Sequence, residues 1–438
     1  MEWKIITPNK EGDWINHRDI AFDTFIPITP EEKFDTKSQS FFVSNSLGLS
    51  SNRDFWVYNS SKQKIVENMT SMSNFFNEQV TSYQNSLKNN PKLDFKEIQV
   101  YNPKIISWSS GLVSMASSGN KAIFKKNNLV ISQYRPFYKQ YLYFDKIFNE
   151  RPGQNSKYFP NPQLGNLVIC VSGIGVTKEF SSLVTNKLPN LDLLGKSQCY
   201  PLYYYEEIGD KKKREIKSSQ TLLETDEPEP LNKYIKRDGI SDFIFEKAKK
   251  QYGESGLTKE DIFYYVYGVL HSPDYQKAFS NNLKKMLPKI PLVDNIADFN
   301  SFSMAGRKLS DLHLNYETVP PYSDVKVTGT EGEYFTISKM KFPKKDQKDT
   351  IIYNSKITIS EIPDKAFQYI VNGKSAIEWI MERYQITTDK DSGIINDPND
   401  WAIEEDNPRY ILDLLLSIIN LSVQTVDIVD GLPELKFE

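Results

Sequence analysis

The spacing of hydrophobic residues along the chain predicts that its first half is built mainly from strands. Short apolar runs, the pattern typical of β-strands, occur at residues 129–132, 140–144 and 166–171. Residues 38–61 predict two further strands joined by a turn, with Asn52 and Arg53 at the tip of the hairpin. One helix interrupts this region, because apolar side chains recur at helical spacing over residues 62–83.

The second half begins with helical patterns and then becomes mixed. Thr258 and Asp261 have the form of a capping box, which predicts a helix start. Ser272 and Pro273 predict another start, with serine as the N-cap and proline in the first turn. The predicted helices cover residues 261–271, 273–287, 299–312, 375–383 and 409–421, and two strands with a lysine-rich turn between them cover 334–342 and 350–360.

These patterns predict an α+β fold with several packed units, because 438 residues exceed one ordinary core. A β-rich unit spans residues 1–207 and a helical unit spans 238–318. Between them, residues 208–237 are first basic and then acidic without clear periodicity, which is typical of a linker or surface loop. A mixed strand and helix unit spans residues 319–438.

Composition narrows the class of protein but leaves its function open. Lys and Arg total 54 against 57 Asp and Glu, and this balance neither requires nor forbids a nucleic-acid partner. The 25 Tyr and 25 Phe residues often stand beside polar ones, as on surfaces that make contacts. We expect a cytoplasmic protein without a membrane partner, because we find no apolar signal core and no apolar stretch of membrane-spanning length.

Histidine and cysteine, two residue types often used in catalysis and in metal sites, are scarce, whereas carboxylates are abundant but no pair of them stands out. His17, His271 and His313 are the only histidines, and none has a partner at metal-ligand spacing, so we predict no metal site. We expect His271 to cap a helix end. Cys170 and Cys199 are the only cysteines and cannot form a disulfide framework or a zinc site, and an apolar run around Cys170 predicts a buried, reduced thiol.

Two short motifs resemble catalytic ones but are incomplete. Gly173 and Gly175 in VSGIGV follow a predicted strand, but a third glycine is missing from the dinucleotide-binding pattern, so a tight turn is expected. The residues 319–322, VPPY, resemble the catalytic motif of adenine-N6 methyltransferases, in which Asn, Asp or Ser comes first. Val319 has no group that could accept a hydrogen bond from the target amino group, so a proline turn is the better interpretation. We predict no catalytic residues in this chain.

An ordered series of longer motifs carries more information than any of these. They are GLSSNRDFWVYN (48–59), YRPFYKQYLYFD (134–145), FPNPQLGNLVICVSGIG (159–175), CYPLYYYE (199–206) and EDIFYYVYGVLHSPDYQKAFSNNLKKMLPKIPLV (260–293). Together they resemble the C-terminal target-recognition region of type ISP restriction-modification enzymes. GDWINHRD (12–19) is similar to the stretch that follows the methyltransferase core in that family.

The resemblance implies sequence-specific binding of double-stranded DNA and docking against a methyltransferase module, without turnover by this chain itself. S-adenosylmethionine, ATP and Mg²⁺ are then expected in the other modules of the parent enzyme, an adenine DNA methyltransferase and endonuclease, and no cofactor in this chain. Two alternatives stay open. The chain could be a methyltransferase or nuclease fragment with its own activity, or a scaffold or carbohydrate-binding module.

Arg, Lys, Asn and Gln side chains on turns and strand ends are the candidates for DNA contact, because they reach phosphates and base edges. Each also has a structural alternative. Arg135 could brace the domain against Asp145 or a backbone carbonyl, and Asn52 and Arg53 could cap the hairpin or contact the methyltransferase module. The loop 151–157 and the run 211–214 could be solvated surface. The candidates are Asn52, Arg53, Arg135, Lys139, Gln140, Arg151, Gln154, Asn155, Lys157, Lys178, Lys211, Lys212 and Arg214.

Overall fold

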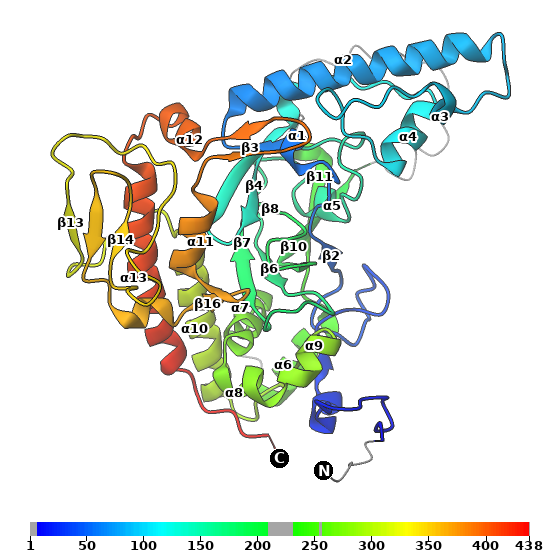
Figure 1. Cartoon of the computed structure of the whole chain (residues 1–438). Helices are drawn as coiled ribbons and strands as arrows, with labels where there is room; N and C mark the ends of the chain where they lie inside the picture. The colour runs from blue at the N-terminus through cyan, green and yellow to red at the C-terminus, as the bar shows by residue number, and fades with distance from the viewer. Residues whose placement is uncertain (1–6, 209–230, 254–255, 438) are drawn as a thin grey trace, which may run out of the picture.

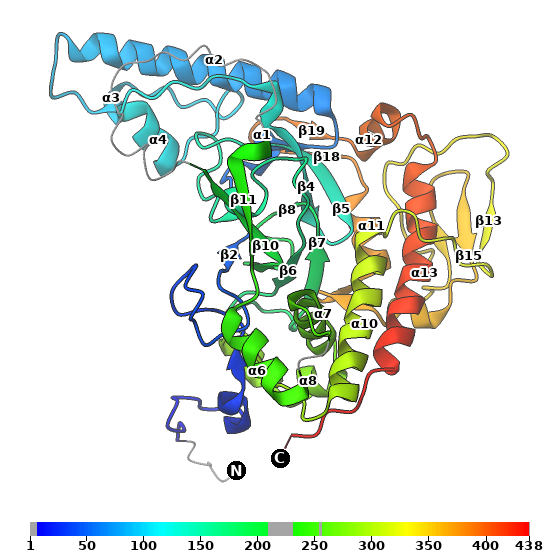
Figure 2. The same cartoon turned by 180° about the vertical axis from the view of Figure 1, so that it is seen from behind.

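The computed structural model of the chain describes residues 7–208, 231–253 and 256–437. Helices and short strands alternate through these residues, which confirms the α+β class. Two four-stranded sheets lie in the middle of the molecule (Figure 1). The helices α10 (Ile296–Leu314) and α13 (Tyr410–Asp430) run side by side along one flank, as Figure 2 shows from behind. At the opposite end, α2 (Lys62–Leu87) projects as part of an arm.

The first central sheet is buried on both faces. Its strands are antiparallel in the order β2 (Ser46–Leu47), β9 (Gln198–Pro201), β6 (Val168–Val171) and β7 (Ser182–Thr185). Side chains alternate between the two faces of a strand. Val168 and Cys170 therefore join one hydrophobic cluster, and Ile169 and Val171 join another. This explains why the sequence here is a continuous apolar run rather than an alternating one.

The two clusters differ in which elements complete them. The helical cluster combines one face of this sheet with the helices of residues 242–309, chiefly α7 (Lys259–Leu270) and α10. The C-terminal cluster combines the other face with residues 312–421, including α11 (Ala376–Arg383) and α13. Each cluster contains residues from the unit expected at 1–207 together with residues of a later unit. The division of the chain into separate units therefore stays a prediction.

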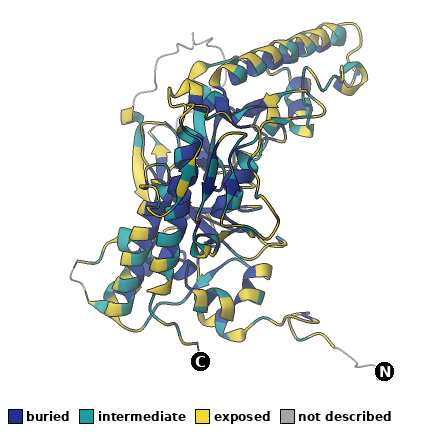
Figure 3. Cartoon of the chain, turned by 60° about the vertical axis from the view of Figure 1, so that its left-hand side comes forward, coloured by how far each residue is buried: buried dark blue, intermediate teal, exposed yellow. Residues whose placement is uncertain are grey.

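The second central sheet carries the arm. Its order is β3 (Tyr58–Asn59), β5 (Tyr138–Tyr143), β4 (Leu129–Arg135) and β8 (Leu188–Pro189), with β4 and β8 parallel. The arm consists of α2, α3 (Phe95–Ile98) and α4 (Ser110–Ser117). One side of α2 is buried and the other is exposed (Figure 3). Its buried side chains and β5 belong to a third cluster, the arm cluster.

The remaining elements are short. They are α1 (Asp54–Val57), α5 (Asn155–Tyr158), α6 (Asp242–Tyr252), α8 (Pro273–Ala278), α9 (Ser280–Lys285) and α12 (Pro398–Glu404), with 3-10 turns at Ile20–Thr24, Lys126–Asn128, Leu231–Lys233 and Asp364–Phe367. The strand pairs are β1 (Ile26–Pro27) with β12 (Lys289–Ile290), β10 (Tyr203–Glu207) with β11 (Tyr234–Asp238), β16 (Ile370–Val371) with β17 (Lys374–Ser375), and β18 (Thr387–Thr388) with β19 (Ile395–Asn396). A last sheet has the order β13 (Lys326–Thr328), β15 (Thr358–Ser360), β14 (Ile351–Ile352).

The hairpin predicted at residues 38–61 is wrong. β2 and β3 belong to different sheets, and the short helix α1 lies between them. Gly48, directly after β2, has no room for a side chain, because a Cβ there would lie 2.4 Å from the carbonyl oxygen of Asn190. It allows two backbones to approach closely, a role that spacing in the sequence does not reveal.

Two other predicted elements differ from the structure. Residues 334–342 form no strand, and only Lys341 makes an isolated bridge, to Ile352. Instead, residues 350–360 fold back on themselves around Asn354, whose Oδ1 accepts the backbone N–H groups of residues 356 and 357. The helix predicted over 273–287 breaks at Phe279, whose ring packs against Phe22 and Phe25.

The last helix, α13, is long and apolar enough to cross a membrane, although the sequence suggested no stretch of that length. However, 67% of its most apolar window is buried inside the protein. Its apolar side chains belong to the C-terminal cluster and pack against α11 and the turn 364–367. We therefore interpret α13 as a core helix.

Candidate nucleic-acid interface

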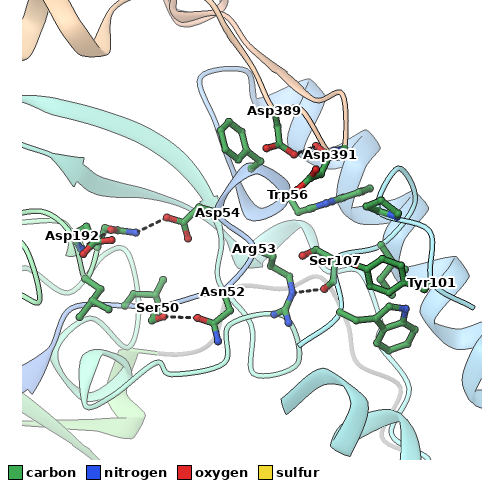
Figure 4. Close-up of a pocket in the computed structure, with 18 residues that line it drawn as sticks. Ser50, Asn52, Arg53, Asp54, Trp56, Tyr101, Ser107, Asp192, Asp389 and Asp391 are labelled. Carbon is green, nitrogen blue, oxygen red and sulfur yellow. Dashed lines mark hydrogen bonds between the residues drawn. The ribbon is translucent and has the colours of Figure 1, made fainter. Parts of the chain in front are cut away.

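Two of the predicted DNA-contacting segments lie on neighbouring loops. Ser50 and Arg151 form an isolated antiparallel bridge in which each backbone N–H donates to the other residue's carbonyl, at 3.2 and 3.0 Å. Asn52 and Arg151 are both exposed. Asn52 has a left-handed backbone (φ 57°), and its Oδ1 accepts a hydrogen bond from the Ser50 hydroxyl at 3.1 Å (Figure 4). The bridge therefore holds two groups suited to base edges on one braced surface.

The loop that follows Arg151 is fixed against the edge strand β2. The backbone N–H of Gln154 donates to the Ser46 hydroxyl at 2.9 Å, and Nδ2 of Asn155 donates to the carbonyl of Leu47 at 3.0 Å. Asn155 is fully buried, so its side chain holds the loop. Lys157 is exposed, with Nζ 4.1 Å from the ring centroid of Phe34. We call the exposed or half-buried residues Asn52, Arg151, Gln154 and Lys157 the polar loop patch.

Arg53 lies beneath this patch rather than on it. Its guanidinium donates to the backbone carbonyls of Ser51, Ser107 and Phe148 and to the hydroxyl of Ser109. Only 4% of the residue is exposed, and burial lowers its pKa to about 10, so it stays protonated at neutral pH. Arg53 thus ties the arm to the loop before Arg151 and does not face solvent.

Arg135 takes the bracing role that the sequence left open. Its guanidinium carbon lies 4.0 Å from the ring centroid of Tyr134, and Nη1 donates to the carbonyl of Tyr134 at 2.6 Å. The same nitrogen donates to Oδ1 of Asn190 at 2.8 Å. A backbone carbonyl is therefore one of its partners, as one alternative expected.

Lys139 and Gln140 also make contacts within the protein. Nζ of Lys139 pairs with Glu317 at 2.5 Å, and both side chains are largely buried. Gln140 is 3% exposed and donates to the hydroxyl of Tyr138 at 3.1 Å and to Asn396 at 2.9 Å. Lys178 is exposed, and its side chain lies beside Gly373 in the β16–β17 turn. The remaining candidates, Lys211, Lys212 and Arg214, lie outside the described residues.

A hollow of about 380 Å³ adjoins Asn52 and was not foreseen (Figure 4). Its acidic lining comes from three separate segments, which explains why no sequence motif revealed it. Carboxylates repel phosphates but accept hydrogen bonds from amino groups such as N4 of cytosine. The four carboxylates are those of Asp54, Asp192, Asp389 and Asp391.

The histidine and glycine motifs have structural roles here. His271 is the C-cap of α7, as predicted, and its Nδ1 hydrogen bonds with the Tyr267 carbonyl at 2.8 Å. The N–H of Gly173 donates to the carbonyl of Gly195 at 3.0 Å, and a Cβ on Gly173 would lie 2.2 Å from the carbonyl oxygen of Lys196. VSGIG is therefore a tight turn packed against another turn, as expected.

The VPPY segment connects α10 to β13. Val319 is buried in the C-terminal cluster, and the carbonyl of Pro320 accepts a hydrogen bond from Asn420 at 2.8 Å. Within residues 7–208, 231–253 and 256–437, no group of three or more His, Cys, Asp or Glu residues is arranged to hold a metal ion.

A comparison with models of known families identifies the family of this chain. A model described as the Type ISP C-terminal specificity domain matches residues 40–414. The chain belongs to this family. The resemblance inferred from the ordered motifs is thereby confirmed, over most of the chain. A comparison with curated proteins returned no match.

Solved structures that share the fold of this specificity domain include two of Type ISP enzymes. A nuclease-deletion mutant of the Type ISP restriction-modification enzyme LlaGI, in complex with a DNA substrate mimic, is 35% identical with a TM-score of 0.82, covering 100% of this chain and 37% of that one. The ATP-dependent Type ISP enzyme LlaBIII bound to DNA is 34% identical with a TM-score of 0.83, covering 99% and 26%. A DrdV–DNA complex is 28% identical with a TM-score of 0.78, covering 99% and 40%. The chain thus spans less than half the length of these relatives.

Proposed function

We propose that this specificity domain recognises a short sequence in double-stranded DNA for a Type ISP restriction-modification enzyme. The observation that carries the proposal is its family membership, together with three relatives of the same fold in complexes with DNA or a DNA mimic. The polar loop patch supports it, because Arg151, Asn52 and Gln154 offer groups that pair with base edges from a braced backbone.

In this proposal the chain acts in the cytoplasm and leaves the bond-making steps to other modules. A methyltransferase module, of the same or a companion polypeptide, is its partner. That module would use S-adenosylmethionine, and the motor and nuclease modules would use ATP and Mg²⁺. The packing contacts of Gly173 and Pro320, in VSGIG and VPPY, support this assignment of the chemistry to other modules. Stoichiometric binding of S-adenosylmethionine to the purified chain, measured by calorimetry, would contradict this part.

Selection from a random-site DNA library followed by gel shift tests the recognition itself. We expect one short asymmetric site, bound more tightly than random DNA. Arg151→Ala is expected to weaken binding to this site by about tenfold or more and to relax the preference at one position, because a bidentate arginine contact contributes about 1–3 kcal/mol of discrimination. Lys157→Ala is expected to weaken specific and random DNA alike and to flatten the salt dependence.

The matched control is Arg307→Ala, which removes a similarly charged side chain on α10 that pairs with Asp261. It should leave DNA affinity unchanged. If neither the wild-type chain alone nor the chain with a methyltransferase module prefers any sequence, the proposal is wrong.

A further inference from the structure

The charges of the arm are distributed unevenly along its sequence. The helix α2 carries two lysines and two glutamates and is therefore neutral. The following stretch, residues 88–128, has seven lysines and no arginine against two acidic residues, which gives a net charge of +5. The whole chain has a net charge of −3, so the positive excess is local to this part of the arm. We call residues 88–128 the lysine segment.

Most of the positive charges of the lysine segment face solvent. Its two carboxylates, in contrast, bind backbone N–H groups in the capping box of α3: Asp94 accepts from Lys96, and Glu97 accepts from Asp94, each at 2.9 Å. In the described part of the chain, neither carboxylate forms an ion pair with a lysine side chain. The exposed lysines are Lys88, Lys92, Lys96, Lys104, Lys121 and Lys126.

The lysine segment covers the buried side of α2. Phe95 of α3 and Leu112 of α4 belong to the arm cluster together with buried side chains of α2 such as Phe76. Both views show the result: α3 and α4 lie below α2, on the side of the arm that is turned toward the rest of the molecule (Figures 1 and 2). The net positive charge therefore belongs to this side of the arm, and α2 on the other side is neutral.

From the tip of the arm, the lysine segment returns to the polar loop patch. Arg53, which lies beneath the patch, donates to the carbonyl of Ser107 and to the hydroxyl of Ser109. Oε1 of Glu150, the residue before Arg151, accepts a hydrogen bond from the N–H of Gly111 at 3.3 Å. The start of α4 is therefore fixed to the loop that carries Arg151, and a duplex that meets the patch would also meet this segment.

The residue type of these cations suits phosphates better than base edges. The ammonium group of lysine is a compact point charge, whereas the planar guanidinium of arginine forms the paired hydrogen bonds that read guanine. Contacts to phosphates position a protein on DNA and carry no sequence information by themselves. The 26 residues of α2 span about 39 Å, the length of about eleven base pairs, so the arm is long enough to follow the duplex for about one turn.

We infer that the lysine segment holds the phosphates of duplex DNA that flanks the recognised site, whatever its sequence. The inference deepens the proposed function, and it rests on that function for the site that the flank adjoins. It divides the work between two surfaces: the polar loop patch reads bases, and the arm adds affinity that depends on the length of the DNA and on salt.

Affinity as a function of duplex length tests this role, measured by fluorescence anisotropy with the full 438-residue chain. A short duplex ends at the edges of the selected site, and a long one continues on both sides for about 15 base pairs of scrambled sequence, beyond the reach of the arm. Wild type is expected to bind the long duplex at least about tenfold more tightly than the short one.

The arm variant replaces four exposed lysines by glutamine: Lys92→Gln, Lys96→Gln, Lys104→Gln and Lys121→Gln. It should lose most of the gain from longer DNA while keeping the preference for the selected site over a scrambled one. The slope of log K against log salt concentration on the long duplex should become shallower by about 2–4, because each lost phosphate contact removes about 0.9. The same four positions changed to arginine keep the charge and should restore the gain.

The matched control removes the same charge from the stretch before β14, which lies on the other side of the molecule from the arm (Figure 1). It should keep the wild-type gain from longer DNA. Its four substitutions, all at exposed lysines, are Lys339→Gln, Lys341→Gln, Lys344→Gln and Lys345→Gln. Circular dichroism verifies that each variant is folded.

Equal gains from longer DNA in wild type and in the arm variant, or no gain in wild type, would overturn the inference. An equal loss in the control variant would also overturn it, because net charge alone would then explain the effect. Failure of the proposed function looks different: wild type would then show no preference for any sequence, while the gain from length could still be measured with random-sequence duplexes.

Discussion

At the residue scale, two buried histidines link three parts of the molecule. Nδ1 of His313 hydrogen bonds with the Tyr267 hydroxyl at 2.7 Å, and its Nε2 with the hydroxyl of Thr425 at 3.0 Å. His271 lies 5.6 Å from His313 between ring centroids. Burial lowers the pKa of His271 to about 4, and burial and the neighbouring histidine hold the pKa of His313 well below its usual range. Both rings are therefore neutral in the folded protein near pH 6.

We predict that these histidines make the fold sensitive to mild acid. In the unfolded chain both histidines take up protons near pH 6.5. In the folded protein His271 takes up a proton only near pH 4. The unfolded state therefore binds more protons in this window, and stability that is fully present above pH 6.5 is lost as the pH falls. Urea unfolding should show a decrease of roughly 2–4 kcal/mol between pH 7 and pH 4.5.

The variant His271→Gln should show a shallower dependence over the same window, because one of the two shifted groups is gone. His17→Gln, which changes an exposed histidine, should follow the wild-type curve. An unfolding free energy that is constant from pH 7 to pH 4.5 would contradict the prediction.

At the element scale, the start of α2 depends on a side chain from the far end of the sequence. Ser61 is its N-cap and accepts from the N–H of Lys64. The carboxylate of Glu404 accepts the Ser61 hydroxyl at 2.7 Å and the N–H groups of Lys62 and Gln63 at 2.9 and 3.4 Å. A carboxylate at a helix N-terminus satisfies free N–H groups and interacts favourably with the helix dipole.

We predict that Glu404→Ala lowers the free energy of unfolding by about 1 kcal/mol, the usual contribution of a helix cap at an exposed site. Hydrogen exchange should also speed up in the first turn of α2. Glu331→Ala, in an exposed loop, is the control for loss of one carboxylate. Equal unfolding midpoints for the two variants would count against this role of Glu404.

The elements that could be predicted from sequence are those whose signals are local. The spacing of Ile65, Met69 and Phe76 predicts α2, and the capping box at Thr258 predicts the start of α7. The polar loop after Arg151 was also expected. The burial of Arg53 was not, because three of its partners lie at residues 107, 109 and 148, and only folding brings them to it. Gly48 and the acidic hollow depend in the same way on contacts between distant segments.

At the scale of the whole molecule, the first central sheet joins the other parts. Its two faces belong to different clusters, and the C-terminal cluster contains Val168, Cys170 and Cys199 together with residues 312–421. The C-terminal part, residues 319–438, is therefore packed into the core, and separating it would expose one face of this sheet to water. Such surface is costly to expose, at about 25 cal/mol per Å² of apolar area.

The reactivity of Cys170 and Cys199 can show whether the C-terminal part stays packed against the sheet, because both belong to the C-terminal cluster. Cys170 on β6 and Cys199 on β9 lie opposite each other as free thiols, with their sulfur atoms 3.6 Å apart. Both are fully buried, and burial raises the pKa of the Cys170 thiol. We predict that neither thiol reacts with Ellman's reagent in the native chain. During a urea titration both should become reactive at the midpoint seen by far-UV circular dichroism, because the C-terminal cluster covers them until the fold is lost.

Ser323→Cys adds a thiol at an exposed position and should react at once, which verifies the assay. Independent separation of the C-terminal part would give a different result. If residues 319–438 can separate from the sheet while the rest stays folded, both thiols will react at a lower urea concentration than the main circular dichroism transition, since both face that part of the core. Coincident transitions would mean that the sheet and residues 319–438 unfold together, and that neither can be removed without the other.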